Sequence, residues 1–182
     1  MIARSDIFST PVWHENFPLP LVDELYDAAY RIKANTTEVA NRSNQGGFQT
    51  KQFEWEEFHP QAKEYIKSVL EEIFKDYDWR ISAWWYNINP EGASNMPHAH
   101  PGNQFVLIMY LTDGDGLLQL INPNTTRINM KGIQDNLASP EVKKGDMLVF
   151  PADIMHYVNV NKRKEDRLSI SMNIQTGIGE PY

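Results

Sequence analysis

The chain has 182 residues, of which 41% are hydrophobic and 12% aromatic, and this predicts one globular domain with a full hydrophobic core. The absence of cysteine excludes disulfides, iron–sulfur clusters and zinc-finger sites. The formal net charge of -7 disfavours nucleic acid as a partner.

The first 78 residues are predicted to be mainly helical after a short strand around Ile7 to Trp13. Apolar residues recur at helical spacing in residues 20–35 and again in residues 59–77. Between these two helices lies the polar stretch NRSNQGGFQT, residues 41–50, whose paired glycines indicate a loop.

The character of the chain changes at Trp79. Residues 79–90 are rich in aromatic and β-branched side chains, which is typical of a strand. Further short strands, separated by turns with Gly, Asp, Asn or Pro, are predicted at residues 104–112, 117–123, 147–151, 155–160 and 167–174. Helices followed by many short strands predict an α+β protein with a jelly-roll or cupin-type core, and a plain β-sandwich is the alternative. We expect a single domain over residues 1–182, with 1–78 as helical support and 79–182 as the core.

Two histidines lie one residue apart in PHAHP, residues 97–101. The prolines favour extended backbone, and residues i and i+2 of a strand face the same side, so His98 and His100 are expected to project together. Such a pair can share a metal ion, whereas the alternative is a polar edge with exposed or hydrogen-bonded histidines. His156 lies far enough along the chain for the intervening strands to return it to the same end of a barrel. Three clustered ligands leave coordination positions open, which favours a catalytic over a closed structural site.

Arg167 begins the last predicted strand, whose neighbouring residues are otherwise apolar or small. If the side chain points inward it needs an anion, because a buried unpaired charge is costly, and the guanidinium group matches a carboxylate well. Ser169 faces the same side of the strand and can donate a second hydrogen bond. The alternative is a surface arginine paired with Glu165 or Asp166.

The ordered set of H-x-H, a distal histidine and R-x-S resembles the Fe(II)/2-oxoglutarate-dependent oxygenases. More narrowly, the chain is similar to the small "putative 2OG-Fe(II) oxygenase" family known from marine bacteria and cyanophages. The matching stretches are FSTPVW, RSNQGGFQT, WYNINPEGASNMPHAHPG, GDMLVFPADIMHYV and DRLSISMNI. The resemblance implies a double-stranded β-helix, which is a form of jelly roll.

The resemblance also implies a metal site in which His98, His100 and His156 bind Fe(II). His100 stands where most members of the wider superfamily have aspartate. Three neutral histidines leave the Fe(II) site with a charge of about +2 rather than about +1, which favours a dianionic cosubstrate. Asp153 is the competing ligand, because a bend before His156 would swing its carboxylate towards the ion.

For the cosubstrate, the resemblance implies that Arg167, helped by Ser169, binds the far carboxylate of 2-oxoglutarate. Tyr110 shares strand parity with Gln104 and is a further candidate for cosubstrate binding, although a core tyrosine is the more common case. Asn87 is a candidate for orienting ligands, although capping a turn in NINPEGASN is at least as common a role.

The implied activity is an Fe(II)- and 2-oxoglutarate-dependent oxygenase that hydroxylates an unidentified substrate, a small molecule or a protein side chain, with O₂ consumed and succinate and CO₂ released. Two alternatives stay open: a three-histidine cupin that does not use 2-oxoglutarate, such as another dioxygenase or an isomerase, and a non-catalytic metal-binding module. No apolar run has the length of a membrane span, and the N-terminus lacks the apolar core of a signal peptide. We therefore expect no membrane partner and a cytoplasmic location, in the host if the chain is phage-encoded, with a homodimer left open.

Overall fold

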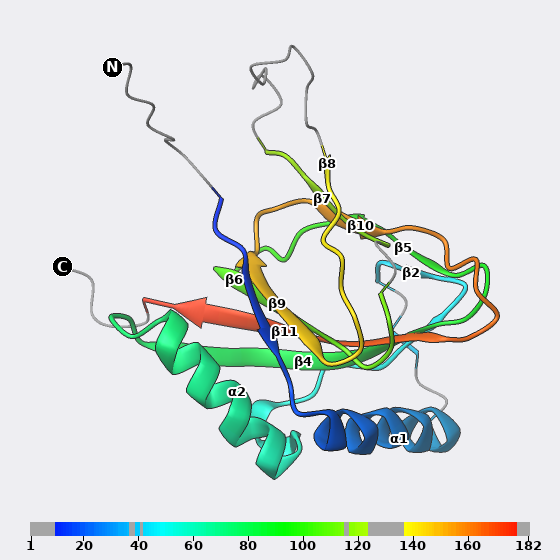
Figure 1. Cartoon of the computed structure of the whole chain (residues 1–182), viewed down its shortest axis with the longest axis horizontal. Helices are drawn as coiled ribbons and strands as arrows, with labels where there is room; N and C mark the ends of the chain where they lie inside the picture. The colour runs from blue at the N-terminus through cyan, green and yellow to red at the C-terminus, as the bar shows by residue number, and fades with distance from the viewer. Residues whose placement is uncertain (1–9, 37–38, 41, 115–116, 124–136, 178–182) are drawn as a thin grey trace.

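Three layers make up the part of the chain that the computed structural model describes, which is residues 10–36, 39–40, 42–114, 117–123 and 137–177. The helices α1 (Leu19–Asn35) and α2 (Pro60–Ile73) lie against one side of a six-stranded sheet, and a five-stranded sheet faces its other side (Figure 1). A short 3₁₀ helix, η1, spans Trp55–Glu57.

Both sheets are antiparallel. The strands of the larger sheet are, in order, β1 (Trp13–Asn16), β9 (Asp146–Pro151), β6 (Phe105–Tyr110), β11 (Arg167–Thr176), β4 (Trp79–Asn89) and β3 (Phe48–Gln49). Those of the smaller sheet are β2 (Asn44–Gln45), β5 (Ser94–His98), β10 (His156–Val158), β7 (Leu118–Ile121) and β8 (Leu137–Ala138). From β4 onwards the chain passes back and forth between the two sheets, and this is the double-stranded β-helix, or jelly roll, that the sequence predicted.

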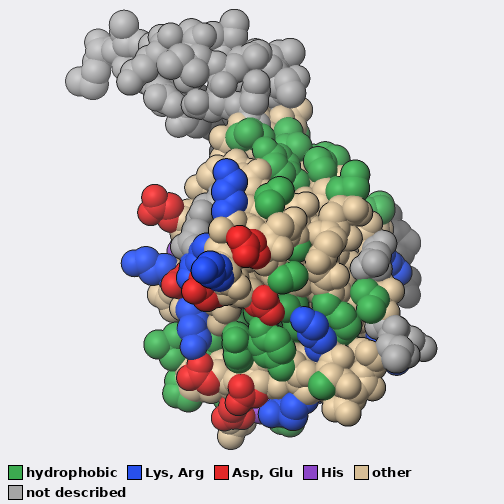
Figure 2. Space-filling view, turned by 90° about the vertical axis from the view of Figure 1, so that its right-hand side faces the viewer, with side chains coloured by type: hydrophobic (Ala, Val, Ile, Leu, Met, Phe, Trp, Pro, Cys, Tyr) green, Lys and Arg blue, Asp and Glu red, His purple; other side chains and the backbone are tan. Residues whose placement is uncertain are grey.

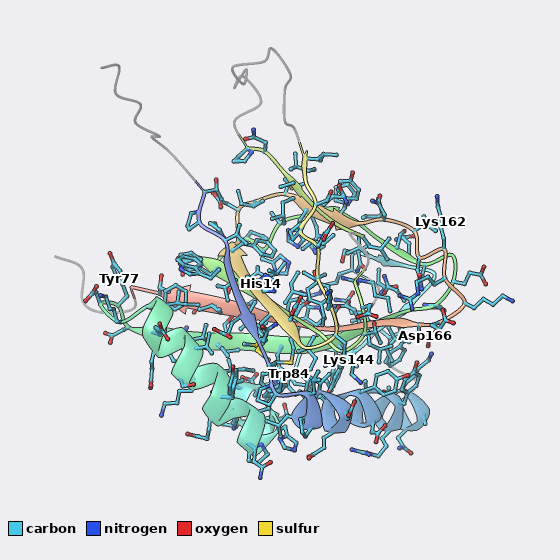
Figure 3. All side chains as sticks on the ribbon, viewed as in Figure 1. His14, Tyr77, Trp84, Lys144, Lys162 and Asp166 are labelled. Carbon is cyan, nitrogen blue, oxygen red and sulfur yellow. The ribbon has the colours of Figure 1, made fainter. Side chains whose placement is uncertain are left out.

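The outer face of the larger sheet is apolar and packs against the helices. Alternate residues of its central strands join one core cluster with Val22, Leu25 and Ala29 of α1 and Ala62, Ile66 and Leu70 of α2, namely Trp84, Tyr86, Ile88, Leu107, Met109, Met147, Val149, Leu168, Ile170, Met172 and Ile174. Figure 3 labels Trp84 in this layer, where its indole Nε1 donates to the carbonyl oxygen of Glu54 at 2.8 Å. The period-2 pattern of the strands therefore anchors the sheet on the helical layer.

The inner face of the same sheet divides into an apolar and a polar half. The apolar half, with Val106, Ile108, Leu148 and Phe150, forms a second core cluster with Leu118, Leu120 and Val158 of the smaller sheet. The polar half lies mainly on β4 and β11 and consists of buried Asn87, Asn89, Arg167, Ser169, Ser171 and Asn173. Because the outer face packs against the helices through apolar contacts, the sheet stays stable although these polar residues are buried on its inner face.

Two predictions about the first half of the chain are corrected. The opening strand is β1 at Trp13–Asn16, later than the predicted Ile7 to Trp13, whose first residues lie outside the described part. The polar stretch around Gly46 and Gly47 is not only a loop, because it also forms β2 and β3, each of two residues. These strands add to the edges of both sheets, and pairing with a tertiary partner left no periodic signal in so short a segment.

The surface is charged in both signs. On the face shown in Figure 2, Lys and Arg side chains lie among Asp and Glu side chains, so this face offers no single-sign surface. Neither of the helices that the structure describes has the length and apolar character needed to cross a membrane.

Matched leucine substitutions test the role of the outer apolar face. Leu107 on β6 is fully buried, whereas Leu19 at the start of α1 is 55% exposed. Leu107→Ala should lower the free energy of unfolding by about 2–5 kcal/mol, because it leaves a cavity in the layer between sheet and helices. Leu19→Ala should change it by about 0.5 kcal/mol or less. Urea unfolding followed by circular dichroism measures both, and equal effects would contradict the layered packing.

Candidate metal centre

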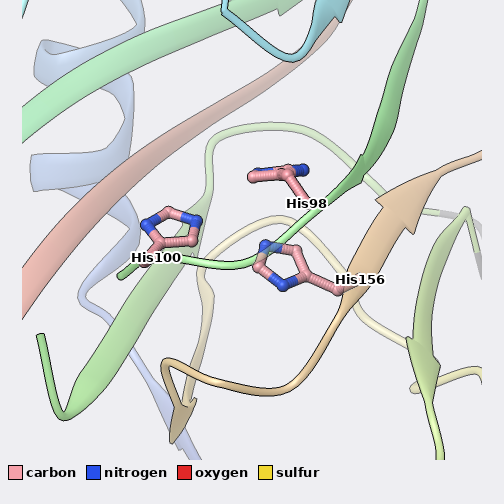
Figure 4. Close-up of side chains that lie close together, drawn as sticks. All are labelled: His98, His100 and His156. Carbon is pink, nitrogen blue, oxygen red and sulfur yellow. The ribbon is translucent and has the colours of Figure 1, made fainter. Parts of the chain in front are cut away.

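Three histidines from two neighbouring strands and the loop after one of them come together at one end of the molecule. His98 ends β5 and pairs in register with His156, the first residue of β10. His100 follows β5, and one ring nitrogen from each of the three lies within 4.8 Å of the other two. Figure 4 shows the three rings gathered around a common point. The structure thus brings together all three histidines that the sequence predicted.

The path by which His100 reaches the cluster differs from the prediction. Its strand has already ended at His98, so the two side chains do not share a strand face as expected. Instead the His100 backbone N–H donates to the carbonyl oxygen of Ala152 at 2.9 Å, and the chain turns at Pro101. Pro97 and Pro101 lack the N–H that a continuing ladder needs, which explains why β5 stops between them.

Each histidine uses Nδ1 for a bond to an oxygen that can only accept. Nδ1 of His98 lies 2.7 Å from the carbonyl oxygen of Met96, and Nδ1 of His156 lies 2.8 Å from that of Ile154. Nδ1 of His100 lies 2.6 Å from Oδ1 of Asn173. A neutral imidazole has one N–H, so these contacts place the proton on Nδ1 and leave the lone pair of Nε2 for another partner. Nε2 of His100 is buried and has no hydrogen-bond partner among the described residues.

The burial of the cluster keeps the rings neutral. Burial lowers the pKa of His98, lowers that of His100 to about 4 and lowers that of His156 to about 3. The proximity of the other histidines depresses the values for His100 and His156 further. Neutral imidazoles with free Nε2 lone pairs are good ligands for Fe(II) and other divalent transition metals. The donor set therefore fits a mononuclear metal ion.

Asp153, the competing ligand in the sequence analysis, does not join this cluster. Its side chain is exposed, and the group of potential ligands that the described residues bring together contains only the three histidines. The bend before His156 turns Ile154 inward instead, where it is buried in the core cluster between the sheets.

Arg167 lies on the polar inner face of β11 and is only 4% exposed. Its Cζ lies 5.3 Å from the centre of the Tyr110 ring, and its Nε has no hydrogen-bond partner among the described residues. None of the ion pairs between described residues includes it. Burial lowers the pKa of Arg167 and raises the pKa of Tyr110, while each side chain opposes the shift of the other. The surface ion pair with Glu165 or Asp166, the alternative in the sequence analysis, does not form.

A polar strip connects Arg167 to the histidines. Ser169, Ser171 and Asn173 follow Arg167 on the same face of β11, and all three are buried. Asn87 on β4 pairs in register with Ser169, and its Nδ2 donates to Oγ of Ser171 at 3.2 Å. The predicted candidates are thus on one surface, and Ser171 and Asn173 extend it. For Ser171 and Asn173, the only indication in the sequence is that they lie on the same face of the strand as Arg167.

The buried polar atoms without a partner mark this strip. Among the described residues, these side-chain atoms are Oδ1 of Asn87, Nε2 of His100, the hydroxyl of Tyr110 and Nε of Arg167. Native proteins leave few buried polar groups unpaired, so four such atoms among the described residues are unusual. The chemistry of these side chains, with metal-ligating nitrogens on the histidines and a cationic guanidinium on Arg167, suits a dicarboxylate such as 2-oxoglutarate.

A cavity of about 460 Å³ opens onto the histidines from outside. His98, His100 and Asn173 contribute to its wall together with Trp85, whose ring stacks on that of His100 with the centres 5.6 Å apart. Gln49 lines the cavity too. With its side-chain amide rotated by 180°, the amide nitrogen donates to the carbonyl oxygen of Ala40 at 2.8 Å and the amide oxygen accepts from Nε1 of Trp85 at 3.1 Å. Trp85 is buried and also borders the cavity.

A ladder of hydrogen-bonded, buried asparagines ends at Ser43, which lines this cavity. Nδ2 of Asn44 donates to Oδ1 of Asn89, and Nδ2 of Asn89 donates to Oδ1 of Asn95, each at 2.8 Å. Asn95 in turn donates to Oγ of Ser43 at 3.2 Å. Because Asn89 belongs to the larger sheet and Asn44 and Asn95 to the smaller one, the ladder links the two sheets beside the site.

The fold and the histidine cluster define a jelly-roll protein with an open, three-histidine candidate metal site. The profile of the family described as "Putative 2OG-Fe(II) oxygenase" matches residues 83–173, half of the chain, and the chain belongs to this family. The cofactors of the family are Fe(II) and 2-oxoglutarate, in agreement with the donor set and the buried arginine. No curated protein matches the sequence.

Solved structures confirm the fold. A prolyl-4-hydroxylase of Pseudomonas putida is 16% identical with a TM-score of 0.63 and covers 92% of this chain and 93% of its own. The viral collagen prolyl hydroxylase of Paramecium bursaria Chlorella virus-1, in its 2-oxoglutarate complex, is 13% identical with a TM-score of 0.62, covering 90% and 94%. HygX from Streptomyces hygroscopicus, with nickel and 2-oxoglutarate bound, is 12% identical with a TM-score of 0.63, covering 93% and 84%. At these identities the likeness concerns the fold.

The depressed histidine pKa values predict a pH dependence of stability. His156 is 2% exposed and has a pKa of about 3 when folded, below the ordinary value near 6.5. Its neutral form therefore contributes fully above about pH 6.5, and this contribution is lost as the pH falls towards the folded pKa. From about pH 7.5 to about pH 5, the metal-free wild type should lose about 2 kcal/mol more unfolding free energy than His156→Gln. Urea titrations in the presence of a chelator measure this, and identical losses would contradict the burial argument.

Proposed function

We propose that the protein is an Fe(II)- and 2-oxoglutarate-dependent hydroxylase that acts on a small molecule or a protein side chain and releases succinate and CO₂. The observation that carries the proposal is a buried arginine that has no anionic partner among the described residues and lies on a polar strip leading, through Asn173, to a cluster of three neutral histidines. Membership of the oxygenase family supports the cofactors, and the prolyl hydroxylases among the similar structures support the reaction type.

In this proposal His98, His100 and His156 hold the iron through Nε2, since their Nδ1 atoms are already bonded to oxygen acceptors. Three protein ligands leave the remaining positions for small ligands. Neutral histidines leave the full charge of the ion uncompensated, so the site favours a doubly negative cosubstrate. When bound, Fe(II) and 2-oxoglutarate supply the oxidative decarboxylation that activates O₂.

Arg167 serves as the anchor for the far carboxylate of 2-oxoglutarate, and Tyr110 and Ser169 border the same position. The burial of Arg167 strongly favours the binding of an anion beside it, because a guanidinium group without an anionic partner between the sheets is costly in free energy. Asn87 offers its free Oδ1 and Ser171 its hydroxyl along the strip between the two ends. These residues bind and orient the cosubstrate, while the apolar cluster around Phe150 excludes water from the opposite side.

The substrate approaches through the cavity bordered by Trp85 and the histidines. Its volume of about 460 Å³ is in the range of small-molecule sites and also admits a single protein side chain. The alternatives of a cupin without 2-oxoglutarate and a non-catalytic metal module leave Arg167 without a counter-ion, so the arginine argues against both.

The first test is turnover. Purified protein with Fe(II), ascorbate and 2-oxoglutarate should release succinate, and His156→Ala should abolish both this release and tight binding of Mn(II), because one of three ligands is lost. His14→Ala is the control, since His14 lies on β1 with its Nε2 3.2 Å from Oδ2 of Asp146 and is not part of the cluster of three histidines. Because turnover without the substrate is slow in many such enzymes, Mn(II) binding is measured beside it by electron paramagnetic resonance. Wild-type Mn(II) affinity in His156→Ala would contradict the ligand assignment.

The second test concerns the anchor. Arg167→Met should weaken 2-oxoglutarate binding about 30-fold or more, because truncating one partner of a buried charge pair costs about 2–5 kcal/mol. Mn(II) affinity should stay within about threefold of wild type. Arg31→Met, on the exposed side of α1, is the matched control and should leave both affinities unchanged. Calorimetric titration of the Mn(II)-loaded proteins decides, and equal 2-oxoglutarate affinities in all three would remove the main support for the cosubstrate.

A further inference from the structure

The hydrogen bond that holds His100 differs from those that hold the other two histidines. His98 and His156 each bond a carbonyl oxygen two residues earlier in their own segment. His100 bonds Oδ1 of Asn173, a side chain 73 residues away on the other sheet. The orientation of the third histidine is therefore set by a tertiary contact rather than by its own backbone.

Ring stacking cannot set that orientation by itself. The rings of Trp85 and His156 lie nearly parallel to that of His100, with interplanar angles of 18° and 19°. Stacked contacts of this kind restrict the tilt of a ring but discriminate little between rotations within its own plane. The directional contact in this plane is the 2.6 Å bond to Asn173, which points Nδ1 towards β11 and leaves Nε2 on the side of the other histidines.

The identity of the amide atom also decides which nitrogen carries the proton. An amide oxygen accepts, so it requires the N–H at Nδ1, whereas an amide nitrogen at the same place would donate and move the ring proton to Nε2. A histidine protonated at Nε2 offers no lone pair to the metal there. Nε2 of His100 is buried without another partner among the described residues, so no other contact in this part of the chain favours one tautomer.

We propose that Asn173 is a positioning residue of the metal site, which holds His100 as the Nδ1–H tautomer with Nε2 directed at the ion. This inference rests on the proposed metal site. Asn173 is 8% exposed and lies on the strand that also carries Arg167. The same strand thus carries both the side chain that orients the third metal ligand and the anchor for the cosubstrate.

Two substitutions separate this role from a general structural one. Asn173→Leu has a similar size but no acceptor, and Asn173→Asp has only acceptors. Nitrogen-15 spectra of the histidine rings in metal-free protein at about pH 8 report the tautomers, and Mn(II) titration reports affinity. In wild type and Asn173→Asp, all three rings should be Nδ1–H tautomers. In Asn173→Leu, His100 alone should lose this state, while His98 and His156 serve as internal controls, and Mn(II) should bind about 10–100-fold more weakly.

The outcomes distinguish the two proposals. Failure of the wild type to bind Mn(II) refutes the metal site itself, whatever the tautomers show. Wild-type affinity together with an unchanged His100 tautomer in Asn173→Leu refutes the role of Asn173 and leaves the metal site standing. So does a loss of affinity in a folded Asn173→Asp as large as that in Asn173→Leu. If leucine impairs folding, as thermal unfolding shows, Asn173→Ala removes the amide without added bulk and is judged by the same two measurements.

Discussion

Four polar side chains alternate with apolar ones along β11 and lie on its inner face, buried between the two sheets. Arg167, Ser169, Ser171 and Asn173 have almost no access to bulk water, so each must find a partner inside the molecule. Asn173 finds one in His100 and Ser171 finds one in Asn87. Arg167 finds no anion among the described residues. The preference of the site for an anionic ligand follows from the need of the buried Arg167 for a partner.

Apolar contacts on the outer face of the same strand offset the free-energy cost of burying these polar groups. Leu168, Ile170, Met172 and Ile174 are fully buried against the helical layer, and their burial contributes roughly 1.5–3 kcal/mol each. The helices therefore have a functional consequence although neither carries a site residue. They stabilise a strand whose other face is left free to hold a charge and unpaired polar atoms, as binding sites commonly do.

The orientations of the three imidazole rings depend partly on local contacts and partly on tertiary contacts. His98 and His156 are cross-strand neighbours with local backbone acceptors, so their rings are oriented as soon as β5 and β10 pair. His100 lies beyond the strand and depends on β11. In the proposed metal site His100 takes the place that aspartate has in most of the wider superfamily, and its second ring nitrogen then requires a partner of its own.

The sequence alone predicted helices packed on a jelly-roll core, most of the strands from Trp79 onwards and the three histidines of the site, because these depend on period-2 and helical patterns and on residue chemistry, and it left open whether Arg167 points inward. It misplaced β1, and it missed β2, β3 and β8, since strands of two residues carry no periodicity. It also expected His98 and His100 to share a strand face, although the strand ends between them. Tertiary structure decided the tautomer of His100, the burial of Arg167 without an anion among the described residues, and the exclusion of Asp153 from the cluster. Each of these depends on which atom of a distant segment lies within hydrogen-bonding distance, and no local pattern in a chain encodes that.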